Sequence, residues 1–236
     1  MAQRKIDGGI KTVVILPRIS REPIADQPKK RKTGREAHLE AVRLETTGNQ
    51  QKAANAYRTA AAAYSIDGND FRTTGRLLDV HTSHLNSAAE YHNQARLETD
   101  EKIKAVARKN AALQFEEAAK CAYSIGCKIN AADHSHRAGW FEKEAIDYEK
   151  AAAEYAKLAD QKESETLLRA AVARLRTAFE TAYDVETSRR QIQTASEHMQ
   201  RAGRQDLTAV FSKCDTWDKL NEFTSELDIA LSVEAE

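Results

Sequence analysis

The chain has 236 residues and balances 36 basic against 36 acidic side chains, so its formal net charge at neutral pH is zero. That balance excludes a protein-wide field that would attract nucleic acid or an anionic membrane, and it leaves local patches as the electrostatic guide to a partner. Three cysteines without framework spacing indicate free thiols in a reducing compartment. Because no stretch approaches about 18 consecutive apolar residues, we expect a soluble, cytoplasmic protein.

Residues 1–33 are predicted to form a disordered basic arm. All three prolines lie within the first 28 residues, and the segment has too few apolar side chains to offset the entropy of ordering it. Its basic residues cluster at the end of the arm and just beyond it, at Lys29, Lys30, Arg31, Lys32 and Arg35. Such a run resembles a nuclear-localisation signal, which makes the nucleus the alternative location, and it suits contact with nucleic acid or an anionic membrane as well as a solubilising role.

Residues 34–231 are predicted to be entirely helical. This stretch has no proline, and most of the chain's 40 alanines lie in it beside Glu, Lys, Arg, Gln and Leu, which are strong helix formers. Glycines that follow helix-like patterns are predicted to end helices, namely Gly48, Gly68, Gly126, Gly139 and Gly203. The expected helices span 34–47, 49–66, 70–85, 87–97, 100–125, 128–138, 140–160, 163–181, 186–202, 204–213 and 216–231. Short turns between them favour antiparallel neighbours, and residues 232–236 form an acidic end.

A repeated pattern of alanine and tyrosine indicates how these helices pack. Tyr57 and Tyr64 are seven residues apart, as are Tyr148 and Tyr155, and a spacing of seven places each pair on one line of a helix. Alanines at three- and four-residue steps flank each pair, at Ala53, Ala56, Ala60 and Ala63 and again at Ala145, Ala152, Ala156 and Ala159. Residues 110–126 carry a third stretch of similar composition. We interpret these as buried seams of stacked helical hairpins, in which small residues allow helix axes to approach closely.

The spacing resembles that of tetratricopeptide repeats. Gly48, Ala53, Tyr57 and Ala60 stand at the offsets of the turn and second helix of that repeat, and Ala41 and Leu44 fit its first helix. Ala145, Ile146, Tyr148 and Ala152 match the second helix again. The resemblance implies an all-α fold, an α/α superhelix of stacked antiparallel hairpins with a right-handed twist.

Within that superfamily, residues 36–180 are most similar in their pattern of alanine and tyrosine to the soluble NSF attachment proteins. The pattern A-x-x-Y-x-x-A-A-x-x-Y occurs twice, at 54–64 and at 145–155. This likeness implies an adaptor for helical-bundle complexes in membrane fusion or trafficking. The chain ends in Ser-Val-Glu-Ala-Glu rather than in the family's leucine-containing tail, so stimulation of an ATPase does not carry over.

Binding is the function class that stacked hairpins favour, because they leave an extended surface for a peptide, a helix or a coiled-coil bundle. Candidate partner-binding residues are polar positions on the expected first helices of hairpins, namely Arg72, Arg76, Asn86, His134 and Arg137. We predict no enzyme, cofactor or metal, since Walker, dinucleotide and G-x-S-x-G motifs are missing from the sequence. The alternative is a metal protein or enzyme that uses His81, His84 and His92, or Cys121, Cys127, Asp133, His134 and His136. The sequence does not determine the oligomeric state.

Overall fold

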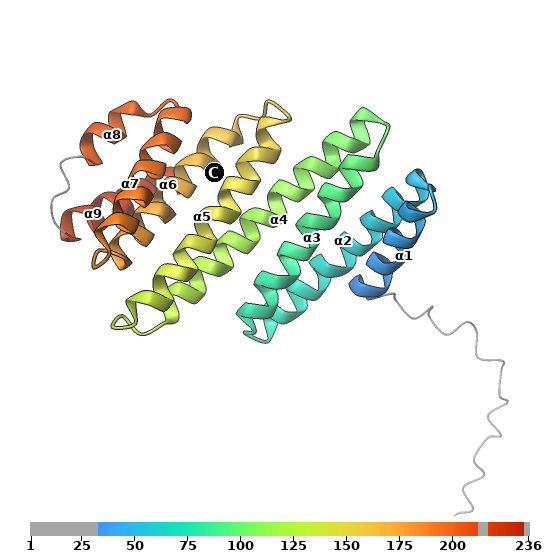
Figure 1. Ribbon diagram of the computed structural model, residues 1–236, viewed down its shortest axis with the longest axis horizontal. Coiled ribbons are helices and arrows are strands. Elements are labelled where there is room, and N and C mark those ends of the chain that lie inside the picture. The colour runs from blue at the N-terminus through green and yellow to red at the C-terminus, as the bar shows by residue number, and fades with distance from the viewer. Residues whose placement is uncertain (1–32, 212–216, 234–236) are drawn as a thin grey trace, which may run out of the picture. The chain divides into compact units, whose positions relative to one another are not determined.

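A computed structural model describes residues 33–211 and 217–233, and within these ranges the chain is all-α. Its helices are α1 (Gly34–Thr46), α2 (Gln50–Thr73), α3 (Leu77–Leu97), α4 (Glu101–Lys128), α5 (His134–Ala156), α6 (Lys162–Glu180), α7 (Val185–Arg201), α8 (Gln205–Phe211) and α9 (Trp217–Val233). Figure 1 shows α1 to α7 side by side, each antiparallel to the next. The helices pack mainly as sequence-adjacent pairs, with α9 packing on α6. The prediction of an all-α chain of hairpins is therefore confirmed.

Three of the five glycines predicted to end helices lie inside them instead. Gly68 is in α2, Gly126 in α4 and Gly139 in α5, so the segment Ser-Ile-Asp-Gly-Asn-Asp is helical rather than a turn. The turn after α2 falls at Gly75, whose φ is +72°. Four predicted breaks, at 67–69, 86, 126–127 and 139, fall inside helices and are wrong. Three of them were placed at glycines, but a glycine inside a helix costs only about 1 kcal/mol, so it need not end the helix.

Two of these helical glycines admit an aromatic ring from the neighbouring helix. A Cβ atom added at Gly126 would lie 2.8 Å from the ring of Phe141, and one added at Gly68 would lie 3.1 Å from the ring of His84. Phe141 and His84 are both buried. The missing side chain therefore brings α4 close to α5, and α2 close to α3.

The alanine and tyrosine seams are buried for most of their predicted length. Tyr57, Tyr148 and Tyr155 are buried, whereas Tyr64 is half-buried against Gly34. The hydroxyl of Tyr57 donates to Glu45 at 2.7 Å, and burial together with this bond raises the pKa of Tyr57 to about 12. The hydroxyl of Tyr155 likewise donates to Glu116 at 2.7 Å, so both of these rings keep their hydroxyls paired at the edge of the packed layer.

Two predicted seam alanines are exposed, which corrects the sequence interpretation. Ala156 is the last residue of α5, and Ala159 follows the helix with a φ of +50°. The seam of α5 therefore ends near Tyr155, because the chain turns towards α6 before the next helical turn is completed.

Side-chain caps fix several helix starts. Thr33 and Glu36 form a reciprocal capping box at α1, so residue 33 belongs to the helical domain rather than to the predicted arm. Asp100, Asp133 and Asp184 accept backbone N–H bonds at the starts of α4, α5 and α7. The last helix reaches Val233, two residues beyond the predicted end at 231.

We expect Gly126→Ala to lower the free energy of unfolding by about 1–3 kcal/mol, because the new methyl group would overlap the buried Phe141 ring. Gly139→Ala is the matched control: nothing lies within 4 Å of an added Cβ there, so better helix propensity should raise stability by about 0.5–1 kcal/mol. Urea unfolding followed by circular dichroism measures both. Equal effects of the two changes would contradict the packing role of Gly126.

Candidate protein-interaction face

Polar side chains connect α1 to α3, α3 to α5 and α5 to α7, in each case across the even-numbered helix that lies between them in the chain. We call the surface formed by these four helices the odd-helix face. Its imidazole–carboxylate ties, with nitrogen-to-oxygen distances, are His38–Glu90 at 2.8 Å, His81–Asp147 at 3.0 Å, His92–Glu154 at 2.8 Å and His198–Glu149 at 2.8 Å. Two further ties join Arg96 to Glu45 at 2.6 Å and Gln191 to Glu142 at 3.4 Å.

The packing order explains why these ties are needed. Each odd helix packs its backbone most closely against the even helices that precede and follow it in the chain. The space between neighbouring odd helices is therefore spanned by long polar side chains rather than by backbone contact. A carboxylate in this space is largely removed from water and needs a charged or hydrogen-bonding partner.

On α5, the buried carboxylates have exposed cations above them. The Asp147 side chain is 3% exposed while Lys150, bonded to it at 3.2 Å, is 46% exposed. Glu154 is 5% exposed while Lys157, bonded to it at 2.7 Å, is 42% exposed. The negative charges thus lie inside the layer and the ammonium groups face solvent. This part of the odd-helix face presents hydrogen-bond donors and positive charge.

Glu149 is the carboxylate with the strongest set of partners. Burial would raise its pKa, but hydrogen bonds from His198 and Arg174 outweigh burial and lower the pKa to about 2. Arg174 holds both carboxylate oxygens, at 2.8 and 3.0 Å. This cluster fastens α5, α6 and α7 together.

At Glu90, burial has a larger effect on the carboxyl pKa than the polar partner does, which is the opposite of the case at Glu149. Burial raises the pKa of Glu90, and the contact with His38 lowers it by less. One of its carboxylate oxygens is buried without a hydrogen-bond partner. The tie between α1 and α3 therefore leaves one buried oxygen without a partner, as the tie between α5 and α7 does for Nδ1 of His198.

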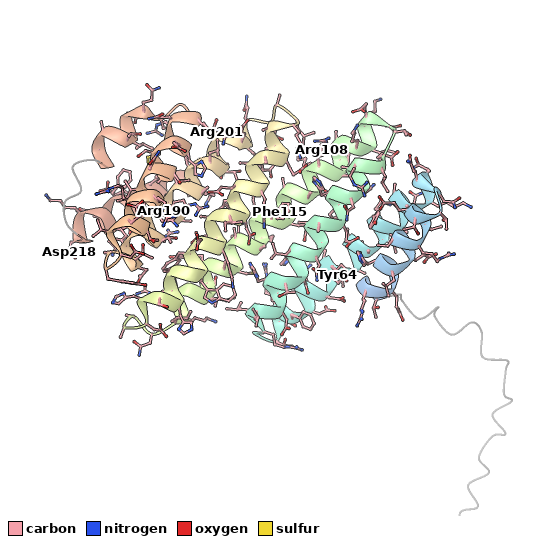
Figure 2. The ribbon with its side chains drawn as sticks, viewed as in Figure 1. Tyr64, Arg108, Phe115, Arg190, Arg201 and Asp218 are labelled. Atoms are coloured by element: carbon pink, nitrogen blue, oxygen red, sulfur yellow. The ribbon has the colours of Figure 1, made fainter. Side chains whose placement is uncertain are left out.

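A hollow of about 310 Å³ opens on the odd-helix face between α3 and α5. Its lining residues are Ala89, His92 and Asn93 of α3, Phe115 of α4, and Lys150, Ala153 and Glu154 of α5. Figure 2 labels Phe115 near the middle of the helical array, on the even helix that lies between α3 and α5. Because Ala89 and Ala153 are short, the Phe115 ring is left half-buried at the bottom of the hollow.

Two of the predicted binding arginines lie near the turn between α2 and α3. Arg72 is in α2, the second helix of its hairpin and not a first helix as predicted, and it donates to Glu117 at 2.7 Å. Arg76 precedes α3, pairs with Asp79 at 2.7 Å and lies over the Phe71 ring. Both guanidinium groups therefore already have partners within the chain.

The structure brings two other predicted residues together on one carboxylate. His134 and Arg137 both contact Glu180, at 2.8 and 3.1 Å, and Glu180 is buried. They hold the start of α5 against the end of α6. Asn86 is exposed on α3, away from this cluster in the sequence and on another helix.

Of the predicted basic cluster, only Arg35 falls in the described part of the chain, where it is exposed on α1. Lys29, Lys30, Arg31 and Lys32 lie outside the described residues. The targeting and anion-contact hypothesis for this cluster stays a prediction.

The histidines of the first predicted metal set have separate partners, and in the second set His134 pairs with Glu180 while His136 pairs with Asp133 at 2.7 Å. His81 pairs with Asp147, His92 with Glu154, and His84 with Gln114 at 2.8 Å. Cys121 is buried, which raises the pKa of its thiol, while Cys127 is exposed. Within residues 33–211 and 217–233, no group of three or more His, Cys, Asp or Glu side chains is placed to hold a metal ion. Among the described helices, none is both long enough and apolar enough to span a bilayer.

Comparison with protein-family models, curated proteins and solved structures finds no match to this chain. The resemblance to tetratricopeptide repeats and soluble NSF attachment proteins therefore stays a prediction.

Sequence reasoning missed the charged ties of the odd-helix face, although one signal for them was present. Asp147 and Lys150 form an acid–base pair at a spacing of three, and Glu154 and Lys157 repeat it seven residues later. The acidic residues of the two pairs directly precede Tyr148 and Tyr155 in the sequence, so the pairs form a line of charged side chains next to the line of tyrosines. The histidine partners carry no such local signal, because they come from α3.

We expect Glu149→Gln to lower the free energy of unfolding by about 1–3 kcal/mol near neutral pH, since it leaves Arg174 and His198 without their carboxylate. The pKa of Glu149 is about 2 in the folded chain and 4.5 ordinarily. The ionised Glu149 side chain therefore contributes its full stabilisation above pH 4.5, and this contribution is lost as pH falls towards 2. The difference between wild type and variant should therefore shrink as pH is lowered from about 6 to about 3.

Urea unfolding at several pH values measures this difference. Glu197→Gln on exposed α7 surface is the control and should change stability by less than about 0.5 kcal/mol. A Glu149→Gln effect independent of pH would show that the Glu149 charge is not what stabilises the cluster.

Proposed function

We propose that the chain is a non-catalytic protein-interaction adaptor whose odd-helix face binds an acidic helical segment of another protein. The observation that supports this is the placement of charge on α5, where exposed Lys150 and Lys157 lie over buried Asp147 and Glu154. A partner that carries carboxylates meets the ammonium groups first and is shielded from the negative charges beneath them.

The histidines of this face support a structural rather than a catalytic role. His81, His92 and His198 each contact a carboxylate on a neighbouring odd helix. In these positions they hold one hairpin to the next, which suits a rigid support. We further propose that the stacked hairpins form a curved superhelical surface, as the tetratricopeptide resemblance implies.

A helical partner follows from the shape of the face. Parallel odd helices leave long shallow surfaces between them, and an amphipathic helix can lie along such a surface with anchors at regular spacing. A helical bundle of the kind implied by the resemblance to soluble NSF attachment proteins has this form. The proposal therefore concerns an acidic helix, either alone or within a bundle.

We expect the double change Lys150→Gln and Lys157→Gln to weaken partner binding by roughly 3- to 10-fold, because it removes two exposed positive charges from the face. The measurement is capture from an extract of the cells that produce the protein, with bound proteins quantified by mass spectrometry at low and raised salt. Raised salt should weaken the wild-type interaction.

The matched control is Lys52→Gln with Lys109→Gln, which makes the same charge change at exposed positions on the even helices α2 and α4. The control should retain the partner. Equal loss in both double variants, or no loss in either, would show that the odd-helix face is not the binding surface. Turnover of a metabolite by the purified chain would overturn the non-catalytic role.

A further inference from the structure

We infer that the hollow around Phe115 receives one apolar side chain of the acidic helix, so that the partner's motif is an apolar residue with a carboxylate about one turn away on each side. The inference rests on the proposed function and specifies the partner's chemistry. It concerns the hollow between α3 and α5 together with Lys150 of α5 and Lys157 at the C-cap of α5, which stand on either side of Ala153 in the sequence.

The hollow has the chemistry of an anchor site for an apolar side chain. The ring of Phe115 and the methyl groups of Ala89 and Ala153 form its apolar lining. The polar lining consists of Asn93, Lys150 and the bonded pair His92–Glu154, in which the Glu154 side chain is only 5% exposed. Ala89 and Ala153 are exposed positions, where a long side chain on either helix would fill the space. A half-buried ring beside exposed alanines leaves apolar surface that an aliphatic side chain can remove from water.

The lysines are spaced to flank such an anchor. Lys150 and Ala153 lie on α5, and Lys157 is the C-cap residue of α5 with helical backbone angles. The three residues stand at i, i+3 and i+7, so the lysines are about 10 Å apart along the helix axis. Lys150 also lies over Phe115, with its ammonium nitrogen 5.6 Å from the ring centroid. A partner helix with glutamates four residues before and three residues after its anchor has the same separation of seven.

Spacing and charge together select the occupant. A helix antiparallel to α5 brings the glutamate three residues after its anchor to Lys150 and the glutamate four residues before its anchor to Lys157 when its central side chain enters the hollow. A basic helix would place like charges together on both sides of the anchor. A second copy of this chain is a separate occupant, which the experiment distinguishes.

The probes are three synthetic helical peptides built on one alanine- and glutamine-rich scaffold. The first carries the pattern Glu-x-x-x-Leu-x-x-Glu, the second replaces the leucine with alanine, and the third replaces both glutamates with lysine. Each is titrated into the full chain labelled with ¹³C at alanine methyl groups. We expect the leucine peptide to bind at least about 10-fold more tightly than the alanine peptide, with the methyl signals of Ala89 and Ala153 shifting.

A protein variant tests the same hollow from the other side. Ala153→Met fills the space and should weaken binding of the leucine peptide about 10-fold while leaving the alanine peptide unchanged. The control is Ala62→Met, the same change at an exposed position of α2 on an even helix. It should leave the affinity for both peptides unchanged.

Each contrary result has a distinct meaning. If the leucine and alanine peptides bind equally and both bind better than the lysine peptide, the hollow is not an anchor site and the inference is overturned while the proposed function stands. If neither acidic peptide binds better than the lysine peptide, the proposed acidic partner is wrong and the inference fails with it. Self-association that Ala153→Met abolishes would assign the hollow to a second copy and overturn the inference.

Discussion

A carboxylate withdrawn from water must be paired, and this requirement organises the odd-helix face. Asp147 and Glu154 satisfy it with an imidazole from α3 on one side and a lysine of their own helix on the other. Because the imidazole belongs to a different hairpin, pairing the charge also joins the two hairpins. The same requirement places the lysines outside, since an ammonium group on a long stem can reach solvent while a short acidic side chain cannot.

Small residues have two opposite consequences in this structure. Inside the layers, alanine and glycine let neighbouring helices approach, as Gly126 does beneath the Phe141 ring. On the odd-helix face, Ala89 and Ala153 leave the Phe115 ring within reach of solvent. A small residue therefore allows close helix packing where a neighbouring helix covers it, and leaves a hollow where no helix covers it.

In the proposed function, the same charged ties serve both stability and recognition. The ties that hold α3 and α5 together also decide which charges are exposed, because Asp147 and Glu154 are buried while Lys150 and Lys157, bonded to them, are exposed. A partner that engages the cations interacts with groups already fixed in position, so little side-chain entropy is lost on binding. The hollow adds an apolar contact between the fixed charges. Together these features support the proposed role in binding.

The sequence by itself determined what depends on near neighbours in the chain. Alanine content, the lack of proline after the arm, and tyrosines seven apart were enough for an all-α hairpin chain, and helices such as α1 and α6 were predicted within about two residues. Tertiary structure decided the rest. Gly68 and Gly126 stay helical because rings from other helices pack against them. His81 meets Asp147 across 66 residues, which helical periodicity cannot reveal, since periodicity gives the face of a helix but not the helix that lies opposite.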